Sequence, residues 1–192
     1  MPSTESGGME IIMKILAGAF VFLIIVIIGY GIKCYNQFVG AKNRVKDQEA
    51  QIHVQLKQRC DLVPNLVETV KGCAGFEKET LEAVMAARGR VVTSRDDRSE
   101  GELEHALGRL FAVSENYPEL KASSGFIELQ RQLSEIENKI AKSRQFYNDT
   151  VLKYNNAIQV FPANIMAIVT GFKPEEFLQI TENEKASVKV NF

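Results

Sequence analysis

Imidazole and thiol side chains are scarce in this sequence, and their scarcity limits the chemistry that the chain supports. Its 192 residues include no tryptophan, two histidines and three cysteines, namely His53, His105, Cys34, Cys60 and Cys73. Neither histidine lies in an H-x-x-x-H or H-E-x-x-H pattern, and no two cysteines are spaced as C-x-x-C. The odd number of cysteines indicates no disulfide framework. So few ligands predict no metal site and no cofactor.

An excess of charge of one sign is also absent. The formal net charge is -1 at pH 7, which provides no basic footprint for nucleic acid. A short basic run is interleaved with Asp96 and Asp97 and is typical of a solvated connector: Arg88, Arg90, Arg95 and Arg98. No motif brings a nucleophile and a base together, and no glycine pair has the spacing of a phosphate-binding loop. We therefore expect neither an enzyme nor a nucleic-acid-binding protein.

The chain does contain one long uncharged apolar run, ILAGAFVFLIIVIIGYGI, from Ile15 to Ile32 between Lys14 and Lys33. As a helix it measures about 27 Å at roughly 1.5 Å per residue, close to the hydrocarbon thickness of a bilayer. A helix also satisfies its own backbone groups in lipid. We predict a transmembrane helix over residues 11–33.

Two other interpretations compete with a membrane-spanning helix. A cleaved signal peptide has a shorter apolar core and small residues before the cut, whereas this run continues into Lys33-Cys34-Tyr35-Asn36. Lipid attachment at Cys34 is disfavoured because Lys33 precedes it. The second alternative is a helix buried in the core of a soluble fold.

Basic residues are more numerous after the run than before it. Lys14 alone precedes it, and four follow: Lys33, Lys42, Arg44 and Lys46. Basic residues resist translocation, so we expect a single-pass protein of the inner cell membrane with its C-terminal region in the cytoplasm. The same four side chains are candidates for contact with anionic lipid headgroups.

The first part of the remaining chain has helical periodicity. Apolar positions from Tyr35 to Leu56 recur at steps of three, four or seven, so the transmembrane helix should continue beyond the membrane. A break is expected at Asp61-Leu62-Val63-Pro64, where Asp61 would cap a new helix, and a kink in one long helix is the alternative. After a connector at 93–98, Ser99 and Glu102 form a capping box that predicts a helix start, and this helix should end before Pro118.

The last long helix has the clearest pattern. From Phe126 to Ala157 apolar and semi-apolar positions alternate steps of three and four, which is a heptad seam. Phe161-Pro162 should end it, and a short apolar helix should then stop at Gly171, before a further turn beginning at Pro174. The predicted fold is all-α, with a transmembrane helix continuing into an antiparallel bundle of long helices.

Asparagine stands next to tyrosine at four places, and the pairs Tyr147-Asn148 and Tyr154-Asn155 are one heptad apart. Buried asparagine and tyrosine need hydrogen-bond partners, so such pairs either fix helix register or form a polar groove that binds a peptide or a lipid headgroup. The candidate polar residues are Asn36, Asn43, Asn65, Asn116, Tyr117, Tyr147, Asn148, Tyr154 and Asn155.

Several motifs, in order, resemble the signature of the LemA family. They are Tyr35–Val39, Lys42-Asn43, Val54–Gly72, Glu115–Ala122, Glu137–Ile140, Ser143-Arg144, Tyr147–Asp149 and Phe161-Pro162. Departures are Cys73 in place of a common tyrosine, Phe76 in place of a common histidine, and the missing early tryptophan. The resemblance implies a bacterial single-span membrane protein with a long-helix bundle, sometimes linked to membrane proteases or to membrane-organelle assembly, and it implies no catalytic site.

The expected organisation is a short N-terminal tail at 1–10, the transmembrane helix at 11–33, a LemA-like bundle at 34–180 and a flexible tail at 181–192. We expect a non-enzymatic scaffold, adaptor or self-assembling membrane organiser, with lipid, further copies of itself or another membrane protein as partners. The alternative is a regulatory or accessory subunit of a membrane protease or another cell-envelope enzyme.

Overall fold

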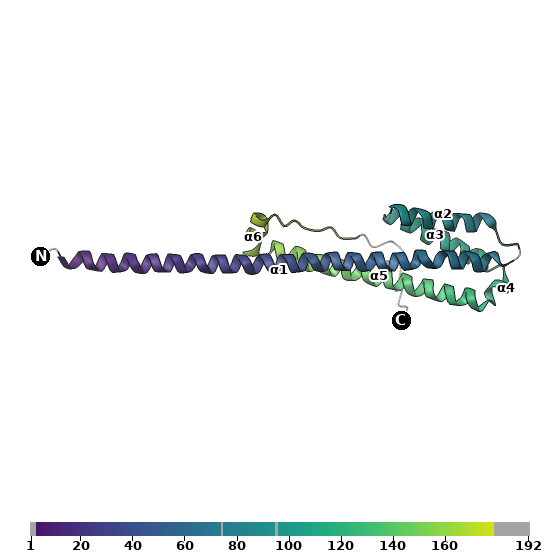
Figure 1. Ribbon diagram of the computed structural model, residues 1–192, viewed down its shortest axis with the longest axis horizontal. Helices are drawn as coiled ribbons and strands as arrows, with labels where there is room; N and C mark the ends of the chain where they lie inside the picture. The colour runs from purple at the N-terminus through teal and green to yellow at the C-terminus, as the bar shows by residue number, and fades with distance from the viewer. Residues whose placement is uncertain (1–2, 74, 95, 179–192) are drawn as a thin grey trace, which may run out of the picture. The chain divides into compact units, whose positions relative to one another are not determined.

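All regular secondary structure that the computed structural model describes is helical, as predicted (Figure 1). The described residues are 3–73, 75–94 and 96–178, with side chains from Met13 onward. The helices are α1 (Ser3–Lys71), α2 (Lys78–Ser94), α3 (Asp97–Ser114), α4 (Pro118–Lys121), α5 (Ser124–Gln159) and α6 (Ala163–Thr170). The tail expected at 181–192 lies outside this range, and helix α1 already begins within the expected N-terminal tail.

The chain divides into two units. The described part of the anchor unit comprises residues 3–47 and Tyr147–Leu178, and the described part of the core unit is Gln48–Phe146. Each unit therefore contains a stretch of α1 and a stretch of α5. The core unit adds α2, α3 and α4, whereas the anchor unit adds α6 and the segment that follows it.

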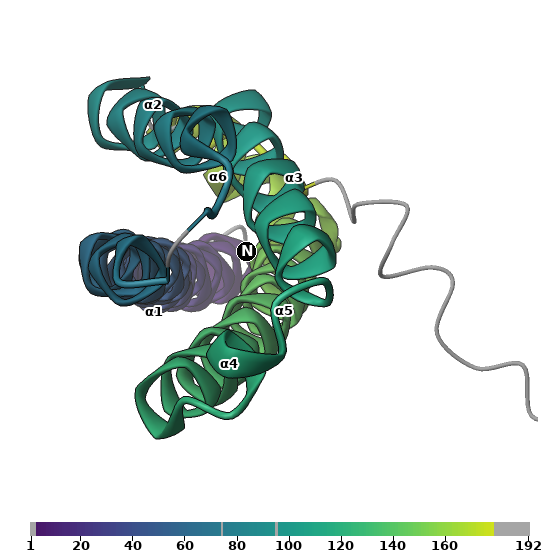
Figure 2. The same ribbon diagram turned by 90° about the vertical axis from the view of Figure 1, so that its right-hand side faces the viewer.

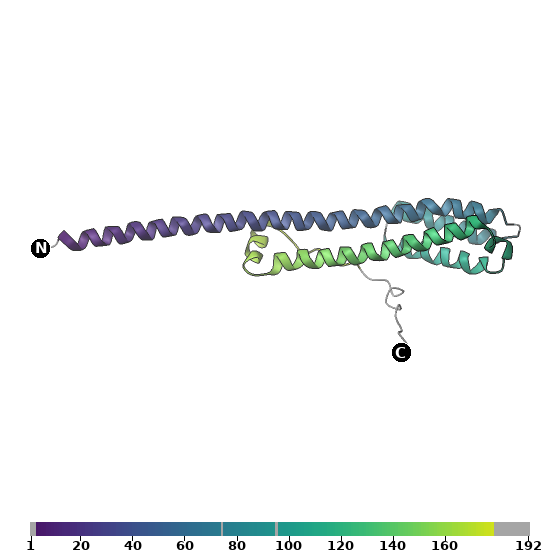
Figure 3. The same ribbon diagram turned by 90° about the horizontal axis from the view of Figure 1, so that it is seen from below.

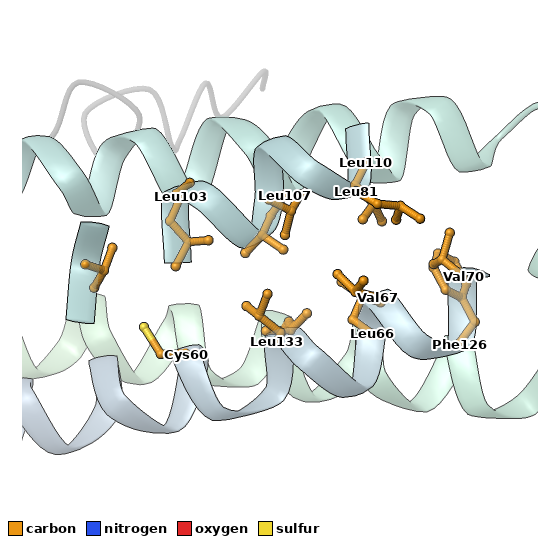
Figure 4. Packing of buried hydrophobic residues seen from close by; sticks show 14 of the residues in the cluster. Cys60, Leu66, Val67, Val70, Leu81, Leu103, Leu107, Leu110, Phe126 and Leu133 are labelled. Atoms are coloured by element: carbon orange, nitrogen blue, oxygen red, sulfur yellow. The ribbon is translucent and has the colours of Figure 1, made fainter. Parts of the chain in front are cut away.

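The core unit is a helical bundle with one hydrophobic core, seen along its helices in Figure 2. Aliphatic side chains of α1, α2, α3 and α5 meet there, and Figure 4 shows how they point toward one another. Those that are almost fully buried include Leu66, Val70, Val84, Leu103 and Leu110. Burial of this apolar surface is the main favourable term holding the four helices together.

The expected break at Asp61–Pro64 is wrong, because α1 continues through Pro64 to Lys71. Proline has no backbone N–H, so the carbonyl of Cys60, four residues earlier, loses its helical partner. Arg88 of α2 supplies the missing donor, with its Nε 2.7 Å from that carbonyl oxygen. The alternative was a kink in one long helix, and its continuous helix is confirmed. A neighbouring helix satisfies the carbonyl that the proline leaves free.

The predicted start of α3 at Ser99 is also wrong. Asp96 is the N-cap, and its carboxylate accepts a 2.7 Å hydrogen bond from the backbone N–H of Ser99. That bond lowers the pKa of Asp96. Glu102 does not reach back to the backbone of Ser99 as a capping box requires, since its carboxylate pairs with Arg90 at 2.6 Å. Both aspartate and serine favour N-caps, and the upstream candidate takes the position.

The proline and heptad signals place the next helices correctly to within a few residues. Helix α3 ends at Ser114, and Pro118 opens the short α4, where its missing N–H is not needed. Helix α5 covers the whole predicted heptad seam.

In the anchor unit, α6 folds back beside α1 after the turn at Phe161-Pro162 (Figure 3). Gly171 ends α6 in the left-handed region at φ 76°, as predicted, which glycine adopts without a Cβ penalty. The turn expected from Pro174 is absent. Residues 172–178 have no regular secondary structure, and we call them the strap.

The apolar run lies in α1, and all of its residues except Gly31 are exposed. Only 6% of its most apolar window is buried by the protein, and the helix is long and apolar enough to cross a membrane. The large side chains from Ile15 to Ile32 are all exposed. The run is therefore not the buried helix of a soluble core, one of the two alternatives.

Candidate functional site

The strap is held on α5 by hydrogen bonds to its backbone. Asn155 binds Glu175 twice: its Nδ2 donates to the carbonyl oxygen at 2.9 Å, and its Oδ1 accepts from the N–H at 2.9 Å. One residue earlier, the buried Tyr154 donates its hydroxyl to the carbonyl of Lys173 at 2.8 Å. A side-chain amide used in this way provides the donor and acceptor that a neighbouring β-strand would offer.

The second pair repeats the arrangement one heptad earlier. Asn148 exchanges two hydrogen bonds with the backbone of Leu178, at 3.1 and 2.9 Å, and the hydroxyl of Tyr147 donates to the carbonyl of Glu176 at 3.3 Å. We call these two Tyr-Asn pairs the clamp. Both Tyr-Asn pairs of α5 that the sequence singled out thus bind the same segment, the strap.

The periods of helix and strap explain the repeat. Seven helical residues rise about 10.5 Å, at roughly 1.5 Å each. Three residues of extended chain cover about 10 Å, at roughly 3.3 Å each. Each step of seven residues back along α5 therefore corresponds to a step of three residues forward along the strap. Asn155 binds Glu175, and Asn148 binds Leu178.

One ion pair ties the strap to α1. Lys42 Nζ lies 2.9 Å from the Glu175 carboxylate, and this interaction raises the pKa of Lys42. Burial raises the pKa of the Tyr154 hydroxyl, which keeps it protonated as a donor. Phe172, at the start of the strap, packs edge-on against Tyr35 and Phe38, with ring centroids 5.8 and 5.4 Å apart.

The remaining candidate polar residues are not gathered at the clamp. In the core unit, Tyr117 donates its hydroxyl to the carbonyl of Gly75 at 2.7 Å and stacks on Phe76 at 5.0 Å, which closes the connection between α1 and α2. Four asparagines lie exposed on helix or turn surfaces: Asn36, Asn43, Asn65 and Asn116. Of the basic candidates, Lys33, Arg44 and Lys46 are also exposed, whereas Lys42 forms an ion pair with Glu175.

The core unit also contains a buried charged network that the sequence analysis did not identify. Arg59, only 4% exposed, binds Glu137 through Nη1 at 2.5 Å and the carbonyl of Glu100 through Nη2 at 3.2 Å. The Glu100 carboxylate in turn accepts from Arg144 at 2.6 Å. Three of these residues, Arg59, Glu137 and Arg144, lie in the motifs that resemble the LemA signature, and this was the one sequence feature that could have pointed to them. Helical periodicity does not identify them, because it predicts that charged residues lie on the solvated face.

Burial governs the titration of this network. Desolvation raises the pKa of the Glu100 carboxyl, and the Arg144 guanidinium opposes the shift. Burial likewise raises the pKa of the Cys60 thiol, which lines a cavity of about 360 Å³ with Arg88 and His53. A thiol with a raised pKa is a poor nucleophile at neutral pH.

Within 13–73, 75–94 and 96–178, no three metal-ligating side chains of histidine, cysteine, aspartate or glutamate come together. The arrangement that the structure does assemble recognises an extended backbone. The hydrogen bonds described above from the clamp to the strap go to main-chain N–H and C=O groups. They therefore select the extended conformation of the bound segment and do not read its side chains.

Comparisons with known proteins agree with the motif resemblance. The model of the LemA family matches residues 48–192, well over half of the chain. Magnetosome proteins MamQ 1 and MamQ 2 of Paramagnetospirillum magneticum are each 27% identical over 175 residues, covering 76% of this chain and 64% of the relative. Protein LemA of Metamycoplasma hominis is 24% identical over 181 residues, covering 88% and 82%. The chain thus spans just under two thirds of the MamQ proteins.

Proposed function

Because this chain belongs to the LemA family, we propose that it is a membrane-anchored scaffold or adaptor, which works by holding partners in contact and not by catalysis. The observation that carries this proposal is α1. One uninterrupted helix contains an exposed apolar run long enough to cross a bilayer and, further along, a wall of the core bundle. An exposed apolar surface of this size is unfavourable in water and marks a membrane or protein contact.

Anchoring supports a contact function for a physical reason. A protein confined to a membrane meets partners in that membrane at a raised effective concentration, so weak interfaces suffice. The partners that we propose are further copies of this chain or another membrane protein. The names of the similar proteins describe no catalytic activity.

The basic residues after the run support a lipid contribution. Lys33, Arg44 and Lys46 are exposed, and each basic residue near an anionic surface contributes about 1 kcal/mol. We propose that these three attract anionic headgroups on the cytoplasmic side. Replacing them with glutamine should lower the fraction of anionic lipid that copurifies with the chain. The matched variant Lys42→Gln should leave that fraction unchanged, because Lys42 is already paired with Glu175.

Anchoring is tested by charging the run. Ile24→Arg with Ile25→Arg places two charges at the centre of the span, each costing roughly 3 kcal/mol there. The double variant should move from the carbonate-resistant membrane fraction to the soluble or aggregated fraction. The control, Ile127→Arg on α5, replaces a side chain of the core unit that is also exposed and should stay with the membrane. Membrane retention of the double variant would contradict anchoring.

Topology and partner type need separate measurements. Phosphatase and fluorescent reporters fused to the C-terminus distinguish the two orientations, and strong phosphatase activity would reverse our cytoplasmic assignment. Photo-crosslinking of the full chain in native membranes, from exposed positions such as Val92, identifies the partner. Self-crosslinks favour an organiser. One stoichiometric partner of another kind favours the alternative, a regulatory subunit of a membrane protease or cell-envelope enzyme.

A further inference from the structure

The chain has a second uncharged stretch that the proposed function does not use. Residues 154–172 contain no aspartate, glutamate, lysine or arginine, and they cover the end of α5, the turn, α6, Gly171 and the first residue of the strap. Five large apolar side chains there are exposed, and Phe161, Ile168 and Val169 reach 76%, 79% and 74%. We call these five the apolar tip: Val160, Phe161, Ile165, Ile168 and Val169.

The apolar tip is held at a defined position along α1. Helix α5 approaches the apolar run of α1 with its C-terminal end, and α6 folds back beside it (Figure 1). Met166 of α6 packs on Gly31, where an added Cβ would lie 3.1 Å from the Met166 Cε. Gly31 is the second-last residue of the run. Phe172, the first residue of the strap, then packs on Tyr35 and Phe38 just beyond the run, so α6 and the start of the strap contact α1 on the two sides of Lys33.

This position coincides with the expected membrane boundary. Lys33 is the first charged residue after the run, and Lys173 is the first charged residue after the apolar tip. Tyr35, two residues after Lys33, is half exposed, as aromatic residues at membrane interfaces often are. If α1 spans the bilayer, its contact with Met166 places α6 where acyl chains give way to headgroups.

We propose that the apolar tip inserts into the lipid monolayer that surrounds the C-terminal end of the α1 span. Its ligand is the acyl and glycerol region of that leaflet, entered to a depth of about 5–10 Å, as for other interfacial helices. The exposed apolar side chains, the uncharged sequence and the fixed contact at Gly31 all fit this environment. The inference rests on the proposed membrane anchoring and adds a second, shallow contact with the same membrane.

The insertion has a mechanical consequence. The anchor unit would then contact the leaflet at two places. One is the α1 span, and the other is the apolar tip at the end of α5 and in α6. Two points of attachment restrict the tilt and rotation that a single spanning helix would leave free. The wedge of side chains also occupies area in one leaflet only, which favours curved or loosely packed membranes.

The test measures the depth of a fluorescent label on the full chain in vesicles of phosphatidylethanolamine and phosphatidylglycerol. Cys34, Cys60 and Cys73 are first replaced by alanine, and an environment-sensitive dye is attached to Ile168→Cys or, in a second variant, to Val169→Cys. We expect several-fold quenching by nitroxides near the top of the lipid acyl chains and little quenching by aqueous iodide. The matched control is Ile127→Cys on α5 of the core unit, also exposed, which should show the reverse.

A label at Ile24→Cys separates the inference from the anchoring on which it rests. Quenching of this label by nitroxides deep in the acyl chains, together with iodide access at positions 168 and 169, would overturn insertion and leave the anchor standing. Loss of deep quenching at position 24 would overturn the anchor itself. Shielding of the tip from both quenchers, accompanied by crosslinks between labelled copies, would also overturn lipid insertion, because a second copy of the chain would then cover the tip.

Discussion

Arg88 Nε donates to the carbonyl oxygen of Cys60 at 2.7 Å, and this is the carbonyl that Pro64 leaves without a helical partner. A side chain of α2 thereby completes the hydrogen bonding of α1 at its one internal proline. The bond lies partly buried, where an unpaired carbonyl is costly. The continuity of α1 and the packing of α2 against it are therefore coupled.

We predict that Arg88→Leu destabilises the core unit by about 1–2 kcal/mol, because it leaves the Cys60 carbonyl unpaired. In a Pro64→Ala background, the restored N–H bonds that carbonyl, and the loss should shrink by about 1 kcal/mol. Urea unfolding of the four variants in mild detergent provides the coupling energy. Arg90→Leu is the matched control, since Arg90 pairs with an exposed carboxylate. Additive effects of Pro64→Ala and Arg88→Leu would refute the coupling.

The clamp predicts a pattern of hydrogen exchange in the strap. The backbone N–H groups of Glu175 and Leu178 are bonded to asparagine side chains, so they should exchange more slowly than those of Glu176 and Phe177. Asn155→Ala should speed exchange at Glu175 about tenfold, because roughly 1.4 kcal/mol of protection is lost with its hydrogen bonds.

The neighbouring Asn156 is exposed and provides the control for this measurement. Asn156→Ala changes the same residue type on the same turn and should leave the rates at Glu175 unchanged. Equal protection at 175, 176, 177 and 178 in the unaltered chain would contradict the three-residue period of the clamp.

The buried charged network should respond more strongly to mutation than an exposed one on the same helix. Arg144→Met removes the partner of the nearly buried Glu100 carboxylate and should destabilise the core unit by about 3 kcal/mol. The control is Arg131→Met on α5. Arg131 also serves two carboxylates and its hydrogen bonds lower the pKa of Glu128 to about 2, yet water screens these pairs. Its loss should leave the unfolding midpoint almost unchanged, and equal effects would contradict the assignment.

Glu100 makes stability depend on pH with a defined sign. Its carboxyl has a raised pKa in the folded state, so the folded chain binds more protons than the unfolded chain between the two pKa values. Its contribution to the free energy of unfolding must therefore fall as the pH rises above 4.5, the ordinary pKa of a glutamate carboxyl.

Glu100→Gln removes this contribution. The difference in unfolding free energy between the unaltered chain and the variant should decline through the window that starts near pH 4.5 and extends upward. Urea titrations at a series of pH values measure it. In Arg144→Met the window should reach higher pH, because the guanidinium that opposes the shift is gone. A difference that increases with pH would mean that the carboxylate is better stabilised in the fold than in water.

Much of the fold was predictable because its signals are local. The apolar run, the heptad seam of α5 and the stop at Gly171 each follow from neighbouring residues along one helix. Two local signals misled for a related reason. Pro64 does not break the helix, because Arg88, 24 residues further along the chain, donates to the carbonyl that the proline leaves unpaired. Ser99 does not cap α3, because Asp96 takes the N-cap position.

The candidate site was predictable in part. The heptad spacing of Tyr147-Asn148 and Tyr154-Asn155 predicts that they share a face, but not what they bind. Their partner is the strap, whose own sequence indicated only a turn at Pro174. Main-chain hydrogen bonds do not depend on the side chains of the bound segment, so these bonds cannot be predicted from the residue pattern of the strap.

By itself the sequence determined the helical class of the fold and which surface is apolar, because helix periodicity and hydrophobicity are set by the order of side chains along one axis. The tertiary structure decided where unpaired polar groups find partners: the carbonyl of Cys60 at Arg88, the buried Glu100 at Arg144, and the strap at the clamp. Each of these joins groups distant in sequence, and a hydrogen bond depends on distance and angle in space.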